Sequence, residues 1–158
     1  MPLVAVGRKE VNREWGDWLN HQWSWDWFVT LTHDNSERAL GNGTRTVVGW
    51  RASVQRWDRW WEEVESLRVG PGPAYWVRAR EPNPWRKGTH FHALVGGVGS
   101  EASRRRAWAA WFARGYGLAR ILPYDPTLGA AHYLAKYVVK ELGDVQFSDG
   151  LGLLRKEG

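Results

Sequence analysis

The sequence predicts an α+β fold, in which helices pack on an antiparallel sheet. Segments with strand character alternate with amphipathic helical segments along the chain. Two of the strand segments, 75–81 and 89–95, are joined only by the turn-forming loop 82–88, which is too short for the crossover that parallel strands need. We therefore expect a β-hairpin here, within a ferredoxin-like or RNA-recognition-like arrangement.

Two further strands are expected. Residues 26–33 (DWFVTLTH) are rich in β-branched and aromatic side chains, which is typical of a strand. Residues 118–122 (LARIL) predict a short strand before the turn at 123–126. For residues 144–158 the sequence leaves open a short strand or an irregular end.

Apolar stripes at steps of three and four residues predict helices that pack on this sheet. Residues 46–67 have the clearest stripe, and residues 101–114 and 128–142 have similar ones. Residues 8–25, which are rich in tryptophan, predict a further helix. The side chains expected in the core are Val47, Trp50, Val54, Trp57, Trp61 and Val64 in the first helix, and Ala107, Trp108, Trp111 and Phe112 in the second.

The composition narrows the class of protein. The chain has 158 residues, which predicts a single domain, and it has no cysteine, which excludes a disulfide framework, a thiolate zinc site and a cysteine nucleophile. We find neither a signal peptide nor an apolar run of membrane-spanning length, so we expect a cytoplasmic protein without a membrane partner. The net charge of +5 favours a polyanionic partner. The 13 tryptophans suit base stacking, but composition alone favours core packing for them.

A pair of histidines in the second hairpin strand is the first candidate site. His90 and His92 are two residues apart, so both imidazoles point to one face of the strand and can chelate a divalent ion. The hairpin can return the Glu81 carboxylate beside them as a third ligand, with Asp26 and His33 as the nearest alternatives. The same sequence pattern would also arise if the two histidines and the glutamate lay at the surface and bound no metal.

The helix predicted at 128–142 has a polar face that combines phenols with ammonium groups. Tyr133, Lys136, Tyr137 and Lys140 recur at steps of three and four, so they share that face. An ordinary amphipathic helix with interfacial tyrosines would have the same pattern.

The order of three motifs carries a more specific resemblance. The segment 28–32 (FVTLT), then 90–92 (HFH), then 133–137 (YLAKY), resembles motifs I, II and III of the HUH endonucleases, and within them the rolling-circle replication initiators (Rep proteins) of the two-tyrosine type. The resemblance covers about 28–140. It implies a five-stranded antiparallel sheet flanked by helices and one HUH nicking domain over 1–158, with a motif core at about 26–142.

The resemblance also implies a chemistry. The Tyr133 phenol would nick single-stranded DNA at a replication origin and keep a 5′-phosphotyrosine until the ends are rejoined. Lys136 would stabilise charge beside it, and the spacing leaves open whether Tyr137 is a second nucleophile or positions the substrate. The implied ligands of a Mg²⁺ or Mn²⁺ ion are His90, His92 and Glu81. No Gly-x-x-x-x-Gly-Lys-Ser/Thr loop is present, so we expect either a host helicase as partner or a chain that is one domain of a longer protein.

Basic and aromatic residues near these motifs are candidates for DNA binding. The residues expected to contact phosphates or stack on bases are Arg78, Arg80, Trp85, Arg86, Lys87 and Lys140. Two alternatives stay open. One is an HUH single-strand transposase, although the glutamine usual on the tyrosine helix of those enzymes is absent here. The other is a non-catalytic nucleic-acid module that stacks bases on Tyr75, Trp76 and Phe91.

Overall fold

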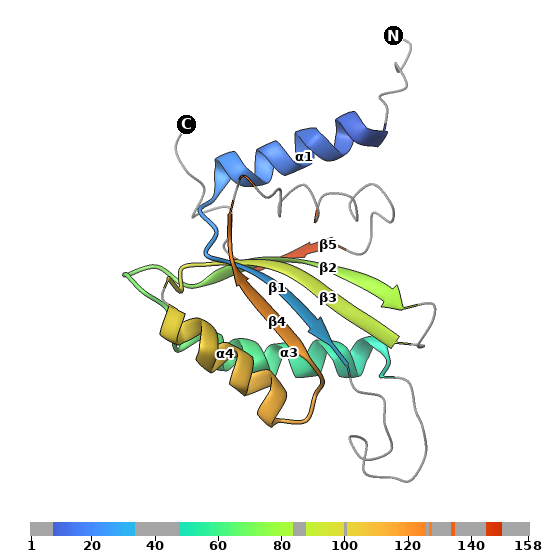
Figure 1. The fold of residues 1–158 in the computed structure, drawn as a ribbon, viewed down its shortest axis with the longest axis vertical. Coiled ribbons are helices and arrows are strands. Elements are labelled where there is room, and N and C mark those ends of the chain that lie inside the picture. The colour runs from blue at the N-terminus through green and yellow to red at the C-terminus, as the bar shows by residue number, and fades with distance from the viewer. Residues whose placement is uncertain are drawn as a thin grey trace.

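The structure is a computed structural model that describes residues 8–33, 48–83, 88–99, 101–125, 127, 134 and 145–149. Within these ranges three helices surround an antiparallel sheet of five strands (Figure 1). In chain order the elements are α1 (Arg8–Gln22), β1 (Trp27–Thr32), α3 (Trp50–Glu65), β2 (Tyr75–Asn83), β3 (Gly88–Gly96), α4 (Glu101–Ala113), β4 (Ala119–Pro123) and β5 (Val145–Phe147). The predicted α+β class is confirmed.

The strand order in the sheet is β4-β1-β3-β2-β5, and each neighbouring pair is antiparallel. The expected hairpin is formed by β2 and β3, whose register pairs Glu81 with His90. Strand β1 lies on the other side of β3 and pairs Thr30 with His92. The C-terminal strand β5, which the sequence left open, forms beside β2. None of the described helices is long and apolar enough to cross a membrane.

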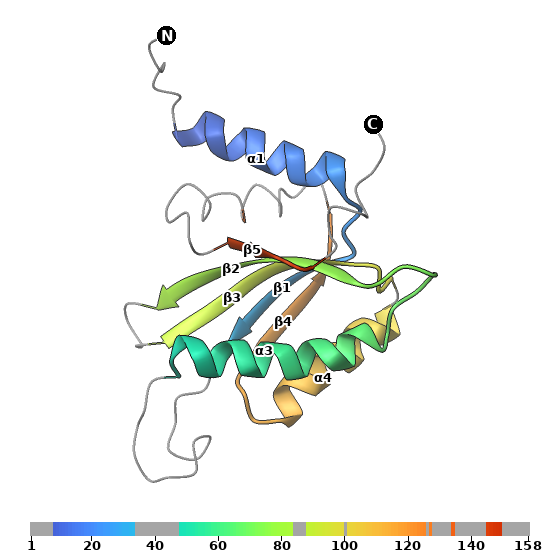
Figure 2. The same cartoon turned by 180° about the vertical axis from the view of Figure 1, so that it is seen from behind.

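Helices α3 and α4 cover one face of the sheet (Figures 1 and 2). The core on this face is built around Trp57, Trp60, Phe91 and Trp111, which are all fully buried. Their rings meet mostly edge to face, for example at 5.0 Å between the centroids of Trp57 and Trp60. Such edge contacts are favourable for aromatic rings, so this cluster holds the two helices firmly against the sheet.

The opposite face carries a second core, which lies under α1. Leu19 of α1 and the following Trp23 and Trp25 pack with sheet residues and with Leu134. The sheet residues of this cluster are Val77, Ala79 and Leu94. Figure 1 shows α1 on the side of the sheet that α3 and α4 leave uncovered.

Several core expectations need correction. Trp57 and Val64 are buried as expected, but Trp60, which was outside the expected stripe, is fully buried as well. In α4, Ala107, Ala110 and Trp111 face the core. Trp108 and Phe112 are 43% and 50% exposed and stack on each other instead. A helix 13 residues long can bury only one stripe of its surface against a single layer, and small alanines allow α4 to approach closely.

Candidate functional site

The alternation of side chains along the strands separates two faces of the sheet. In β3, Phe91 and Ala93 belong to the core under α3 and α4, while Leu94 belongs to the core under α1. His90 and His92 alternate with Phe91 and Ala93, so they share the face of Leu94. By the same alternation Glu81 follows Val77 and Ala79 onto that face. We call it the histidine face.

His92 is the centre of the site. Its side chain is nearly buried, and its Nε2 lies 2.7 Å from Oε2 of Glu81. Its Nδ1 lies 3.3 Å from the hydroxyl oxygen of Thr30 on β1. The ring of Phe28 stacks on the imidazole at 6.4 Å between centroids. Neighbours from the two adjoining strands, β1 and β2, therefore fix the orientation of this ring.

These contacts limit the tautomers that suit His92. A carboxylate only accepts hydrogen bonds, so Nε2 donates to Glu81 in this arrangement. The Thr30 hydroxyl can accept from Nδ1 or donate to it. When Nε2 is instead used as a metal ligand, Nδ1 donates to Thr30, which is the usual way in which a neighbour fixes the tautomer of a ligating histidine.

The residues at the site fit a divalent metal ion in their chemistry. Two imidazoles and one carboxylate on one face suit Mg²⁺ less than Mn²⁺, but they leave open positions for substrate oxygens in either case. The rings of His90 and His92 are 6.0 Å apart between centroids and nearly parallel. Among the described residues no three His, Asp or Glu side chains stand close enough together to hold a metal ion as they are.

The two alternative third ligands lie elsewhere. Asp26 precedes β1 at the far end of the sheet, where its Oδ2 accepts a hydrogen bond from the amide of Val98 at 3.0 Å. His33 lies on the face of α3 and α4, with its ring against Phe91 and Trp111. His33 is near enough to His90 to interact with it electrostatically, but of the three candidates Glu81 is the one with a direct contact to the pair, at 2.7 Å from His92. That Glu81 binds a metal stays a prediction.

The burial of His33 has a consequence for stability. Desolvation and the nearby charge of Arg56 lower the pKa of His33 from 6.5 to about 3. The unfolded chain binds a proton at this residue below pH 6.5, while the folded chain does so only near pH 3. Stability from the neutral ring is therefore complete above pH 6.5 and is lost as the pH falls toward 3.

We expect this loss to reach at most about 1.4 kcal/mol per pH unit between those values. The measurement is urea unfolding of the wild type and of His33→Gln at pH 7 and pH 4.5. Because glutamine does not titrate, the variant should lose less stability on acidification than the wild type. Equal losses for the two proteins would contradict this account of His33.

Arg78 does not belong to the site, contrary to our expectation that it contacts phosphates. It alternates with Val77 and Ala79 and therefore faces α3, where only 5% of the residue is exposed. Its guanidinium carbon lies 4.5–5.9 Å from the centroids of four aromatic rings, and two of its nitrogens donate to Oε1 of Gln146. Burial lowers the pKa of Arg78 to about 10. The residue is a charged part of the core that joins β2, β5 and α3.

Arg80 is likewise on the face of α3, with its guanidinium carbon 4.7 Å from the ring centroid of Trp50. It is half-buried and turned away from His92. The expectation that it contacts a phosphate beside the histidines is therefore not supported. The other expected DNA contacts, Trp85, Arg86, Lys87 and Lys140, lie outside the described residues.

The catalytic helix expected at 128–142 is described only at Leu134. Tyr133, Lys136 and Tyr137 lie outside the described residues. Leu134 is helical and fully buried, and it packs with Val77, Ala79 and Leu94 on the histidine face. The chain next to the proposed nucleophile thus lies on the same face of the sheet as His92.

The three rings expected to stack on bases in a non-catalytic nucleic-acid module are packed wholly or partly in the two cores. Phe91 is fully buried under α3, and Trp76 packs on Trp57 in the same layer. Tyr75 is half-buried, with its ring 5.5 Å from that of Trp25 between centroids. Phe91 is therefore closed to a base, whereas Tyr75 and Trp76 are only partly buried.

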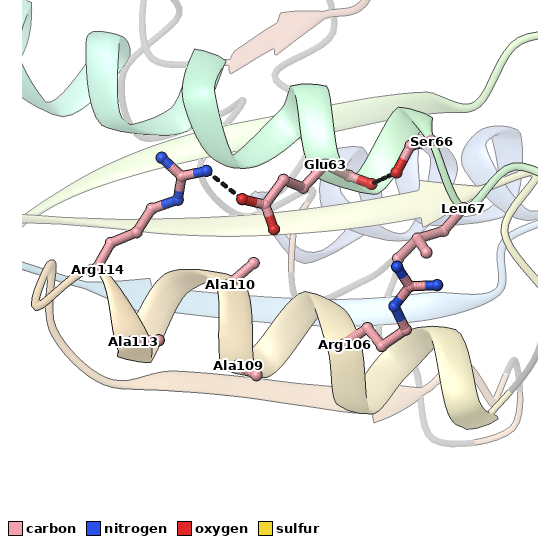
Figure 3. Close-up of a pocket in the computed structure, with 8 residues that line it drawn as sticks. All are labelled: Glu63, Ser66, Leu67, Arg106, Ala109, Ala110, Ala113 and Arg114. Carbon is pink, nitrogen blue, oxygen red and sulfur yellow. Dashed lines mark hydrogen bonds and ion pairs between the residues drawn. The ribbon is translucent and has the colours of Figure 1, made fainter.

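A groove between α3 and α4 is a separate feature (Figure 3). The helices that line it cover the face of the sheet opposite the histidines. Its lining residues are Glu63, Ser66, Leu67, Arg106, Ala109, Ala110, Ala113 and Arg114. Glu63 pairs with Arg114 inside the groove, so these two charges largely neutralise each other. The groove contributes nothing to the histidine site.

One residue near the site was missed by sequence reasoning. Arg120 of β4 pairs in register with Thr30, the neighbour of His92. The motif LARIL marks a strand, but nothing local indicates that this strand lies beside β1.

Scans of this chain against protein-family models, curated proteins and solved structures found no match.

Proposed function

We propose that this protein is an HUH endonuclease of the replication-initiator type, which nicks and rejoins single-stranded DNA. The observation that carries the proposal is the convergence of three distant motifs on the histidine face. Thr30 of the first motif contacts His92 of the second, and Leu134, inside the third, packs on the same face. Distant segments meet in any folded core, but here they meet around a nearly buried imidazole that contacts a carboxylate and a hydroxyl, and this supports a shared site.

The reaction has two steps, nicking and joining. The phenolate oxygen of Tyr133 attacks the scissile phosphorus, the bond from phosphorus to the 3′ oxygen breaks, and the released 3′-hydroxyl takes up a proton. In the joining step a 3′-hydroxyl attacks the phosphotyrosine, and the phenol is regenerated. A divalent ion, Mg²⁺ or Mn²⁺, neutralises charge on the phosphate when it is bound.

The residues of the chain have separate tasks in this scheme. His90, His92 and Glu81 would hold the ion, and Thr30 would orient the His92 ring. A phenol has a pKa near 10, so Tyr133 needs a stabilising charge at neutral pH, for which Lys136 is one turn away. The biological setting we propose is cytoplasmic, with a replication origin of a plasmid or virus as substrate and a host helicase as partner.

The experiment that tests the function is covalent capture. The protein is incubated with Mn²⁺ and a pool of single-stranded oligonucleotides, the complexes are denatured, and the attached strands are sequenced. We expect attached strands that share a 5′ sequence, and no attachment in EDTA. Binding without any attachment would favour the non-catalytic alternative, and excision with joining of flanking ends would favour the transposase.

The tyrosine assignment gives a sharper outcome. Tyr133→Phe should fold and bind DNA but form little or no covalent adduct, because the attacking oxygen is missing. Tyr137→Phe should still make the first nick. The measurement is adduct formation with a labelled oligonucleotide, followed by identification of the phosphopeptide. A label on Tyr137 alone would reverse the order of the two tyrosines, and a label on Tyr75, Tyr116 or Tyr124 would refute the proposed helix.

A further inference from the structure

Strand β4 adds a row of exposed side chains to the histidine face. Ile121 belongs to the core under α3 and α4, and Ala119 packs against it. Tyr124, just past the strand, packs with the opposite core under α1. The even-numbered residues therefore lie on the histidine face. Arg120 is exposed, and the apolar residues on either side, Leu118 and Leu122, are 67% and 37% exposed.

The register brings this row into line with the site. Arg120 pairs with Thr30, and Thr30 pairs with His92, so the three residues lie in one line across β4, β1 and β3. Neighbouring strands are about 4.8 Å apart, so Arg120 stands about 10 Å from His92 between Cα atoms. A long arginine side chain spans much of that distance. No carboxylate of the described residues pairs with Arg120.

The other strand arginines are unsuited to the same task. Arg78 and Arg80 both face α3, and each is packed against aromatic rings. Among the described strand residues, Arg120 is therefore the one arginine on the histidine face. For the strand residues that the structure describes, positive charge on the histidine face therefore comes from β4 and not from β2.

The open edge of β4 is itself poorly suited to a protein partner. The amide of Tyr124 and the carbonyl of Leu118 pair toward β1, so the groups of Ala119, Ile121 and Pro123 point outward. Arg104 of α4 already donates to the carbonyl of Ile121 at 2.8 Å, and Pro123 has no amide proton. An added β-strand would find few hydrogen-bonding groups here, whereas a DNA strand lying across the face needs none of them.

We propose that Arg120 binds a backbone phosphate of the single-stranded DNA, and that Leu118 and Leu122 contact the adjoining sugars or bases. The DNA then crosses the sheet from the histidines over Thr30 to β4, and Arg120 is a positioning residue for the strand. This inference rests on the proposed function. It goes further by giving the path of the DNA, which no motif defines.

The first test measures the salt dependence of binding without cleavage. A fluorescent single-stranded oligonucleotide of mixed sequence is titrated with the full chain in EDTA at several salt concentrations. Arg120→Gln should reduce the slope of log affinity against log salt by about 0.7, as expected for one lost phosphate contact on a single strand. The matched control is Arg59→Gln, an exposed arginine on α3 at the other side of the sheet, which should keep the wild-type slope.

The second test uses the absence of cysteine from the chain. Arg120→Cys and Arg59→Cys each introduce a single thiol, whose rate of modification is measured with and without saturating oligonucleotide. DNA should slow modification at position 120 severalfold and leave position 59 unchanged. Equal slopes in the first test, or equal protection at both positions in the second, would overturn the path over β4. If the wild type still forms covalent adducts in that case, the proposed function stands and only the path fails; if it binds no single-stranded DNA, both fail.

Discussion

His92→Ala should reduce covalent-adduct formation by more than about 100-fold, because it removes a proposed metal ligand. Loss of a residue that only hydrogen-bonds to a metal ligand already lowers metal affinity or activity by about 10- to 100-fold. The imidazole of His92 is the point where Glu81 and Thr30 meet, so its removal breaks the link between the two. The measurement is the initial rate of adduct formation with a captured oligonucleotide in Mn²⁺. Thr30→Val, which keeps the shape of the side chain, should lower this rate by about 10- to 100-fold, because the His92 ring loses the hydroxyl that orients it.

The control for this prediction is a second histidine. His21 is exposed at the end of α1 and far along the chain from the site, so His21→Ala should keep the wild-type rate. Because His92 is nearly buried, urea unfolding of the His92 variant must accompany the assay. A folded His92→Ala protein that nicks at the wild-type rate would refute the metal site.

Trp57→Ala should lower the free energy of unfolding by about 3–5 kcal/mol, a large part of the 5–15 kcal/mol typical of a domain. Trp57 is fully buried between α3 and the sheet. Its ring lies 5.2 Å from that of Trp76 and 5.3 Å from that of Phe91 between centroids. The centroid of the Trp57 ring also lies 5.0 Å from the guanidinium carbon of Arg78. The substitution therefore removes a ring that faces a buried charge. Denaturant unfolding followed by circular dichroism measures the change.

Two variants bracket this result. Trp57→Phe should cost less than Trp57→Ala, since it keeps an aromatic ring and removes an indole nitrogen that has no hydrogen-bond partner. Trp108→Ala should cost only about 1 kcal/mol, because that side chain is 43% exposed and loses mainly its stack on Phe112. If Trp57→Ala were no more destabilising than Trp108→Ala, the core assigned under α3 would be wrong.

The position of Glu81 beside His92 could be predicted because a tight hairpin leaves few registers. The same alternation of strand side chains could also have excluded Arg78 and Arg80 from the site. Both are an odd number of positions from Glu81, so they must face away from it in a regular strand. Residues that are close in the sequence of a strand therefore lie on opposite faces of the sheet.

The exposure of Trp108 and Phe112 was less accessible to prediction. A helical stripe indicates which residues share a side, but α4 has apolar residues on more than one side. Only the position of α3 and β4 around α4 selects Ala107, Ala110 and Trp111 for burial. The choice depends on which neighbours are present, and that information is spread over distant segments.

Local periodicity and a short loop are enough to predict the class of fold, the hairpin and the shared face of His90, His92 and Glu81 from the amino-acid sequence. The pairing of β4 with β1 and of β5 with β2 is visible only in the folded sheet, and so is the position of Arg120 on the face of His92. Pairing between distant strands depends on the packing of the whole sheet against its helices. A strand carries no local mark of the neighbour it will pair with, so its side chains join a site only once the sheet has formed.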